Sequence, residues 1–234
     1  MPQLARDPTL FSTYKHQGEA YDSAVCRARG GSYNARMLEL RGLRRLHVGP
    51  IDLSIGKGTC VSLMGASGSG KSALLRMIAD LDPHEGDALL DGRACSSMPA
   101  PEWRRLVTYV AAESGWWEES VAAHFAVDAG LESLLPAVGI AREAATWPVA
   151  RLSTGERQRL ALLRAFRPAN RVLLLDEPTS GLDAESIGMI EKLLRDRLAQ
   201  GTSILMVTHD AEQAARMGSR HLLLRDGQVE ERAP

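Results

Sequence analysis

The sequence has few cysteines, almost no net charge and no long apolar run, and each absence narrows the class of protein. Its 234 residues include three cysteines, Cys26, Cys60 and Cys95. An odd count, with Cys60 in a strand-like apolar run, argues against a disulfide framework and favours a reducing compartment. The formal net charge of -1 gives no global attraction to nucleic acid, so no nucleic-acid partner is expected.

Membrane-spanning and secretory features are also missing from the sequence. No apolar stretch reaches membrane-spanning length, and no early apolar segment resembles a signal peptide. If the protein works at a membrane, we expect another chain to supply the span. The length and the apolar fraction of 44% suit one α/β domain with a substantial core.

Residues 1–36 have neither helical nor strand periodicity, and we expect an irregular or disordered tail. Strand-like alternation begins at Met37-Leu38-Glu39-Leu40. One interpretation is that Met37 is the true start of the protein. The alternative is a genuine tail that binds a partner.

One glycine-rich stretch organises the remainder of the chain. It follows the apolar run 60–64, precedes an expected helix over 71–80, and consists of Gly65, Ala66, Ser67, Gly68, Ser69, Gly70, Lys71 and Ser72. Glycines let backbone N–H groups point inward, and a helix N-terminus adds positive potential, so the pattern predicts a phosphate cradle. Lys71 is expected to reach the β- and γ-phosphates, and the Ser72 hydroxyl to hold Mg²⁺.

The pattern of apolar residues predicts alternating strands and helices. Strands are expected at 37–41, 50–55, 60–64, 88–90, 107–110, 172–175 and 203–208, with a closing hairpin over 221–230; helices are expected at 99–106, 153–167, 183–200 and after 210. The strand signal disappears over about 113–150, which we interpret as a small helical insertion with short helices at 121–127 and 131–138.

Three polar residues follow buried strands. Asp176 and Glu177 come directly after the apolar run 172–175, and His209 follows the run 203–208. Buried carboxylates need a cation or donors, and ligands bind at the carboxyl ends of parallel strands. We expect Asp176 to bind Mg²⁺, Glu177 to act as general base, and His209 to reach the γ-phosphate or orient the base.

Ser153-Thr154-Gly155-Glu156 reads as a capping box, which predicts a helix start and a second anion site. At this point the chain resembles a nucleotide-binding subunit of an ATP-binding cassette (ABC) transporter. The stretch 65–72 resembles Walker A, 152–156 the family signature, 172–177 Walker B, 180–183 the D-loop, and His209 the switch histidine.

The resemblance implies a fold and a mechanism. The fold is α/β, a P-loop NTPase core with a mostly parallel sheet, an N-terminal antiparallel β subdomain and a short helical insertion within an ATPase domain over 37–234. Two domains pack head to tail around two ATP molecules with Mg²⁺, and Ser153, Thr154 and Gly155 contact the partner's γ-phosphate. Hydrolysis then drives a separate membrane permease, with the chain cytoplasmic and peripheral at the inner face of the membrane.

Some residues depart from the family pattern. Thr154 replaces a glycine of the signature and Glu156 a glutamine, while Ala111-Ala112 stand where the Q-loop has Pro-Gln. We expect altered coupling rather than lost hydrolysis, with Glu113 a possible substitute for the glutamine.

In the family that the chain resembles, an aromatic residue before the Walker A stretch normally stacks on adenine, and the segment 43–48 contains none. His47 is the best candidate there, and Arg44 or Arg45 an alternative through cation–π contact. Trp116-Trp117 are read as interface anchors or as core.

Two other functions remain as alternatives. A regulatory module could dimerise on ATP with little turnover; Glu177 and His209 argue against it, whereas Ala112 leaves it open. A soluble ABC ATPase of DNA repair or of ribosomes usually carries a coiled-coil insertion or a second cassette, and neither is present here. The signature helix and His209 disfavour a P-loop kinase.

Overall fold

The computed structural model describes residues 36–126 and 130–232. The tail expected over 1–36 lies outside these residues, except that Arg36 opens the first strand, and Cys26 lies outside them as well. Within the described residues, no helix combines the length and apolar character that crossing a bilayer requires.

The larger sheet is mostly parallel, as predicted. Its order in the described residues is β10-β9-β3-β8-β7-β6. Its strands are β3 (Cys60–Met64), β6 (Val107–Val110), β7 (Val172–Asp176), β8 (Ser203–Val207), β9 (Arg220–Arg225) and β10 (Gln228–Arg232). Neighbouring strands run parallel, except that β9 and β10 form the expected antiparallel hairpin.

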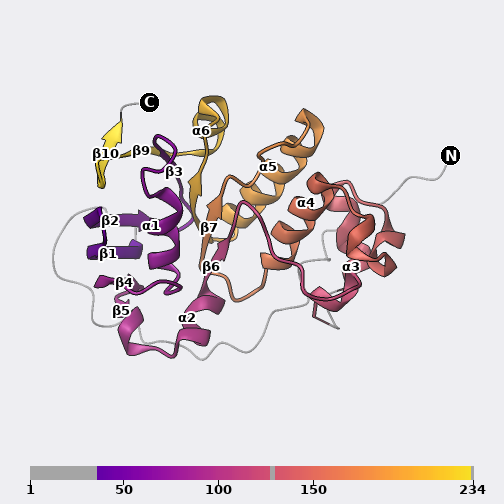
Figure 1. Ribbon diagram of the computed structural model, residues 1–234, viewed down its shortest axis with the longest axis horizontal. Helices are drawn as coiled ribbons and strands as arrows, with labels where there is room; N and C mark the ends of the chain where they lie inside the picture. Colours follow the sequence, from indigo (N-terminus) through magenta and orange to yellow (C-terminus); the bar gives the residue numbers. More distant parts are fainter. Residues whose placement is uncertain (1–35, 127–129, 233–234) are drawn as a thin grey trace. The chain divides into compact units, whose positions relative to one another are not determined.

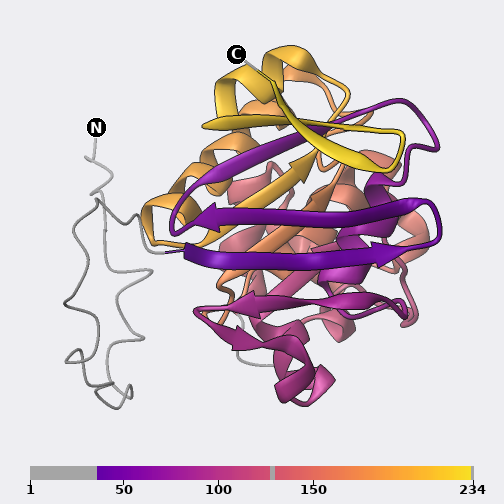
Figure 2. The same ribbon diagram turned by 90° about the vertical axis from the view of Figure 1, so that its left-hand side faces the viewer.

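The smaller sheet is antiparallel and has the order β2-β1-β4-β5. Its strands are β1 (Arg36–Arg45), β2 (Val48–Gly56), β4 (Glu85–Leu90) and β5 (Arg93–Ala94). Figure 2 shows β1 and β2 side by side across the face of the molecule. This sheet is the expected N-terminal β subdomain.

Helices cover both faces of the larger sheet. The helices of the described residues are α1 (Lys71–Ile78), α2 (Ala100–Leu106), α4 (Thr154–Ala165), α5 (Ala184–Ala199), α6 (Ala211–Met217) and, packed against its neighbouring turns, α3 (Leu131–Leu134). In Figure 1, α1 lies between the two sheets, while α4 and α5 lie on the opposite side of the larger sheet.

Burial on both faces explains the continuous apolar runs of the central strands. In β7, Val172 and Leu174 join the cluster that contains α1, whereas Leu173 and Leu175 join the cluster that contains α4 and α5. A strand covered on both sides has no polar face, so period-2 alternation disappears from its sequence.

The segment expected to be a helical insertion consists mostly of 3-10 turns. Besides α3, these are Ala122–His124, Leu135–Val138, Arg142–Thr146 and Val149–Arg151. The helix expected over 131–138 is present as α3 and the turn that follows. The helix expected over 121–127 is wrong for the described residues, because helical geometry ends at His124 and Phe125 is extended. The His124 ring bonds back to the preceding loop, accepting the N–H groups of Trp117 and Glu118 at 3.0 Å each.

Candidate active site

The glycine-rich stretch forms the turn between β3 and α1 that its sequence predicts. Gly68 and Gly70 have φ values of 77° and 101°, in the left-handed region that favours glycine. A Cβ atom at Gly70 would lie 2.3 Å from Cγ2 of Val48, so a side chain does not fit there. The turn thus brings its backbone close to β2 and leads directly into the N-terminus of α1.

Lys71 directs its ammonium group into this turn. Nζ donates to the carbonyl oxygens of Gly65 at 3.0 Å and Ala66 at 2.9 Å, and the residue is 7% exposed. The Ser69 hydroxyl is buried there without a hydrogen-bond partner. A cation, an unpaired hydroxyl and the N-terminus of a helix together fit an anionic group such as a phosphate chain.

Asp176 ends β7 and is 5% exposed. The Tyr109 hydroxyl, from the neighbouring strand β6, donates to Oδ2 of Asp176 at 3.0 Å. Burial, together with the charge of Asp176, raises the pKa of Tyr109 well above its usual value, so the hydroxyl remains a donor. One oxygen of Asp176 is therefore held by a neutral donor.

Ser72 lies in the first turn of α1, a helix that packs against β7, and it is exposed. A hydroxyl and a carboxylate are the kinds of oxygen that Mg²⁺ takes from protein. Among the residues described, no group of three or more His, Cys, Asp or Glu side chains is placed to hold a metal. Mg²⁺ commonly takes one or two protein oxygens and completes its shell with water and phosphate, so Ser72 and Asp176 fit such an ion.

Glu177 and His209 meet at the carboxyl ends of the adjacent strands β7 and β8. Oε1 of Glu177 lies 2.9 Å from Nε2 of His209, and the side chains are 30% and 51% exposed. Glu177 also has a φ of 48°, a left-handed conformation that costs about 1–3 kcal/mol for a residue other than glycine. Such strain persists only where surrounding contacts impose it, and it is typical of functional sites.

The predicted capping box is present at the start of α4. The Ser153 hydroxyl accepts the N–H of Glu156 at 3.2 Å, and the Glu156 carboxylate accepts the N–H of Ser153 at 2.8 Å. The second of these bonds is the main cause that lowers the pKa of Glu156. Ser153 and Thr154 are exposed, and Gly155 is half-buried.

One chain does not bring all the predicted site residues together. Lys71, Ser72, Asp176, Glu177 and His209 lie on α1 or at the ends of β7 and β8. Ser153, Thr154 and Gly155 lie at the start of α4, and α4 and α1 are on different sides of β7 in Figure 1.

Comparison with known proteins shows the family of this chain. Residues 48–180 match the family described as ABC transporter. The chain belongs to the ABC transporter family. It is an ATP-binding and ATP-hydrolysing ABC subunit with the expected P-loop NTPase fold.

Several relatives are named aliphatic sulfonates import ATP-binding protein SsuB. That of Paracoccus denitrificans is 37% identical over 206 residues, which cover 83% of this chain and 80% of the relative. That of Pseudomonas entomophila is 38% identical over 196 residues, covering 76% and 67%. A solved dimeric ATP-binding cassette in a post-hydrolysis state with ADP and Pi is 26% identical, with a TM-score of 0.74, covering 84% of this chain and 98% of that one.

The structure separates the three candidates for adenine stacking in this ABC subunit. Arg44 pairs with Glu85, and Arg45 pairs with Asp82 at 2.7 Å. Nε2 of His47 lies 3.6 Å from where a Cβ atom of Gly70 would be, next to the glycine-rich turn. The placement favours His47, and its role in binding the base stays a prediction.

The residues after β6 replace the usual Q-loop and lie against α4. Ala112 and Glu113 are exposed. They line a cavity of about 300 Å³ whose other lining residues are Ser114, Trp116, Thr154, Arg157 and Gln158. Glu113 thus lies beside the start of α4, and its substitution for the missing glutamine stays a prediction.

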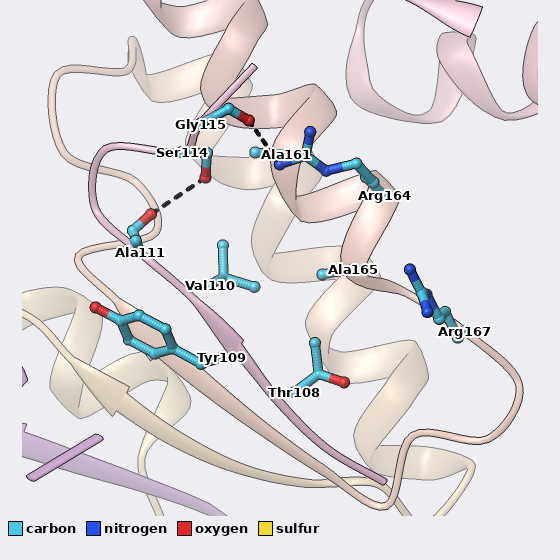
Figure 3. A pocket seen from close by; sticks show the side chains of 10 residues that line it. All are labelled: Thr108, Tyr109, Val110, Ala111, Ser114, Gly115, Ala161, Arg164, Ala165 and Arg167. Atoms are coloured by element: carbon cyan, nitrogen blue, oxygen red, sulfur yellow. Dashed lines mark hydrogen bonds between the residues drawn. The ribbon is translucent and has the colours of Figure 1, made fainter. Parts of the chain in front are cut away.

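Arg164 of α4 holds the same loop from the other side. Its guanidinium lies 4.8 Å from the ring centre of Trp116 and 4.7 Å from that of Trp117, and it donates to Gly115 O at 3.1 Å. Figure 3 shows Arg164 reaching Gly115 above a cavity of about 270 Å³ between β6 and α4. Trp116 is half-buried, so it belongs partly to the core, whereas Trp117 is 68% exposed.

Two residues at the site were not found from the sequence. The sequence places Tyr109 in a predicted strand, and only the pairing of β6 with β7 brings it to Asp176. Gln158 donates from Nε2 to the carbonyl oxygen of Glu177 at 2.9 Å. Its spacing of four residues from Thr154 was the available signal, because residues four apart share one face of a helix.

Proposed function

We propose that this chain is the ATPase subunit of a transporter, in which two such domains close head to tail around two ATP molecules to drive a separate membrane permease. Family membership and the dimeric cassette of similar structure support this proposal. The relatives are named for import, which supports import as the direction. The second domain is another copy or a paired ABC subunit, and residues that select the cargo belong to the permease.

ATP binding is assigned to the turn after β3. The phosphate chain is held by the backbone of Gly65, Ala66, Ser67, Gly68, Ser69 and Gly70, by Lys71 and by Ser72. On phosphate binding, Lys71 exchanges its two carbonyl contacts for phosphate oxygens, and the unpaired Ser69 hydroxyl gains a partner. Ser72 and Asp176 would hold Mg²⁺, which supplies charge neutralisation on the phosphates.

Glu177 is the general base in this proposal. It accepts the proton of a water molecule that attacks the γ-phosphate, while His209 fixes the carboxylate through the 2.9 Å contact. This contact, at the ends of two parallel strands next to Asp176, is the observation that carries the hydrolytic function. A binding module with little turnover does not require such a pair.

The second half of each ATP site comes from the partner domain. Ser153, Thr154 and Gly155 at the capped N-terminus of α4 offer hydroxyl and N–H donors to the partner's γ-phosphate. A complete site therefore exists only in the dimer, so ATP holds the two domains together until hydrolysis. The loop 111–118 and the segment to residue 150 contact the permease, which places the chain at the inner face of the membrane from the cytoplasmic side.

Ala112 in place of glutamine alters the link between this docking segment and the ATP site. Lys71, Asp176, Glu177 and His209 are all retained, so we expect hydrolysis to continue with changed coupling. The stacking of Arg164 on Trp116 and Trp117 provides another mechanical link from the loop to α4.

ATP turnover by the purified chain, beside Glu177→Gln, tests the function. Wild type is expected to hydrolyse ATP, and Glu177→Gln to lose at least 100-fold in turnover because the base is gone. Size-exclusion chromatography with ATP is expected to show a stable dimer for Glu177→Gln only. Asp226→Asn, in the exposed β9–β10 turn, is the matched control.

Two outcomes contradict this proposal. Turnover that survives Glu177→Gln would remove Glu177 as the base. ATP-dependent dimerisation without any turnover by wild type would favour the regulatory module.

A further inference from the structure

Gln158 joins α4 to the main chain of the proposed catalytic base. It lies in the second turn of α4 and donates from Nε2 to the carbonyl oxygen of Glu177 at 2.9 Å. In the part of the chain that the structure describes, it makes the one side-chain hydrogen bond from α4 to Glu177.

Glu177 depends on its surroundings for its backbone conformation. Its φ of 48° lies in the left-handed region, which L-residues other than glycine, asparagine and aspartate rarely adopt. Its N–H donates to Val207 O at 3.0 Å, and its carbonyl accepts both Gln158 and the N–H of Ser180, the latter at 3.2 Å. The strand contact fixes the N–H side of Glu177, so Gln158 acts on the carbonyl side.

The same helix carries the donors for the partner's nucleotide. Ser153 caps α4 through bonds with Glu156, so the first turn is rigid and continuous with Gln158. In the proposed dimer, Gln158 therefore lies on the direct path from the start of α4 to the peptide group of Glu177.

We propose that Gln158 is a positioning residue for ATP hydrolysis. It holds the peptide group of Glu177 so that the Glu177 carboxylate faces the attacking water only when the start of α4 contacts the partner's nucleotide. This inference rests on the proposed function. In the closed dimer, Gln158 thereby links the γ-phosphate bound in one site to the base of the other site.

The test compares Gln158→Glu and Gln158→Leu in the full chain with Gln200→Glu. Both Gln158 variants remove the donor, and leucine adds no charge. The carbonyl of Glu177 keeps its bond from Ser180, so the fold is expected to remain intact. Gln200→Glu makes the same change at the exposed end of α5, away from the site.

Loss of one positioning hydrogen bond is expected to lower kcat about five- to tenfold in both Gln158 variants, with KM for ATP within twofold of wild type. Combined with Glu177→Gln, either variant is expected to dimerise at the same ATP concentration as Glu177→Gln alone, because the α4 cap is untouched. The control Gln200→Glu is expected to match wild type in both assays.

A kcat within twofold of wild type in the Gln158 variants would overturn the inference. So would a fall in kcat that is matched by a rise in KM and by loss of ATP-dependent dimerisation, since that pattern indicates a structural role. Failure of the proposed function looks different, because wild type would then lack any turnover that depends on Glu177.

Discussion

At the scale of single residues, ion pairs decide which side chains beside the glycine-rich turn remain available to a ligand. Arg45 is held by Asp82, and Asp82 also accepts Arg76, which lowers the pKa of its carboxyl group. His47 is exposed and next to the phosphate turn. An exposed imidazole beside bound phosphate can stack on a base, whereas a guanidinium already paired with a carboxylate has less reason to do so.

We therefore expect His47→Ala to weaken ATP binding about tenfold, because base stacking contributes roughly 1–3 kcal/mol. Arg45→Ala, the matched control, is expected to leave the affinity for ATP within twofold of wild type. His47→Tyr keeps a ring that can stack, so it is expected to match or exceed the wild-type affinity. Titration with a fluorescent ATP analogue measures the three dissociation constants. A larger loss from Arg45→Ala than from His47→Ala would assign the stacking to the arginine.

At the scale of elements, α4 is fixed at its N-terminus by local bonds and farther along by tertiary ones. The capping box closes its first turn, and Arg164 attaches its last turn to the loop after β6. The first kind of contact can be read from the spacing of Ser153 and Glu156. The second joins residues 49 positions apart, and no local pattern marks it.

The capping box makes the stability of the protein depend on Glu156 ionisation. The fold lowers the pKa of Glu156, chiefly through the hydrogen bond from the Ser153 N–H. The ionised carboxylate therefore contributes fully to the free energy of unfolding above the unfolded pKa near 4.5, and this contribution disappears as the pH falls through the folded pKa. Glu156→Gln is expected to reduce the free energy of unfolding by about 0.5 kcal/mol at pH 7, and by less at pH 4.

Urea denaturation at the two pH values measures the change. Glu185→Gln is the matched control, since it lies in the first turn of α5. A loss for Glu156→Gln that is equal at pH 7 and pH 4 would contradict the role of its charge.

At the scale of the whole molecule, two apolar clusters on either side of the larger sheet hold the ATPase together. Both clusters consist of residues from β1 onward. Met37 is 1% exposed and its carbonyl accepts the N–H of Asp91 at 2.9 Å, so the packed core extends to the start of β1.

A chain that begins at Met37 is accordingly expected to fold and to bind ATP with an affinity within twofold of the full chain. Circular dichroism and the same nucleotide titration provide the measurement, with the full chain as reference. Loss of the folded state on truncation would show that the tail belongs to the fold.

The sequence by itself determined the succession of strands and helices along the chain, the glycine-rich turn after β3 and the cap of α4. Each of these depends on residues that are close together in the chain. Glycine spacing, a capping pair and unbroken apolar runs are local signals. Among the described residues, the helix predicted over 121–127 fails where His124 bonds back to the loop before it.

Only the tertiary structure decided which polar groups meet. Strand order places Tyr109 on Asp176 and His209 on Glu177, and helix packing places Gln158 on the carbonyl of Glu177. It also places α4 and α1, the helix that Lys71 opens, on different sides of β7, which no spacing along the chain could show (Figure 1). The reason is physical: local sequence fixes backbone conformation, whereas contacts between distant residues depend on how sheets and helices pack.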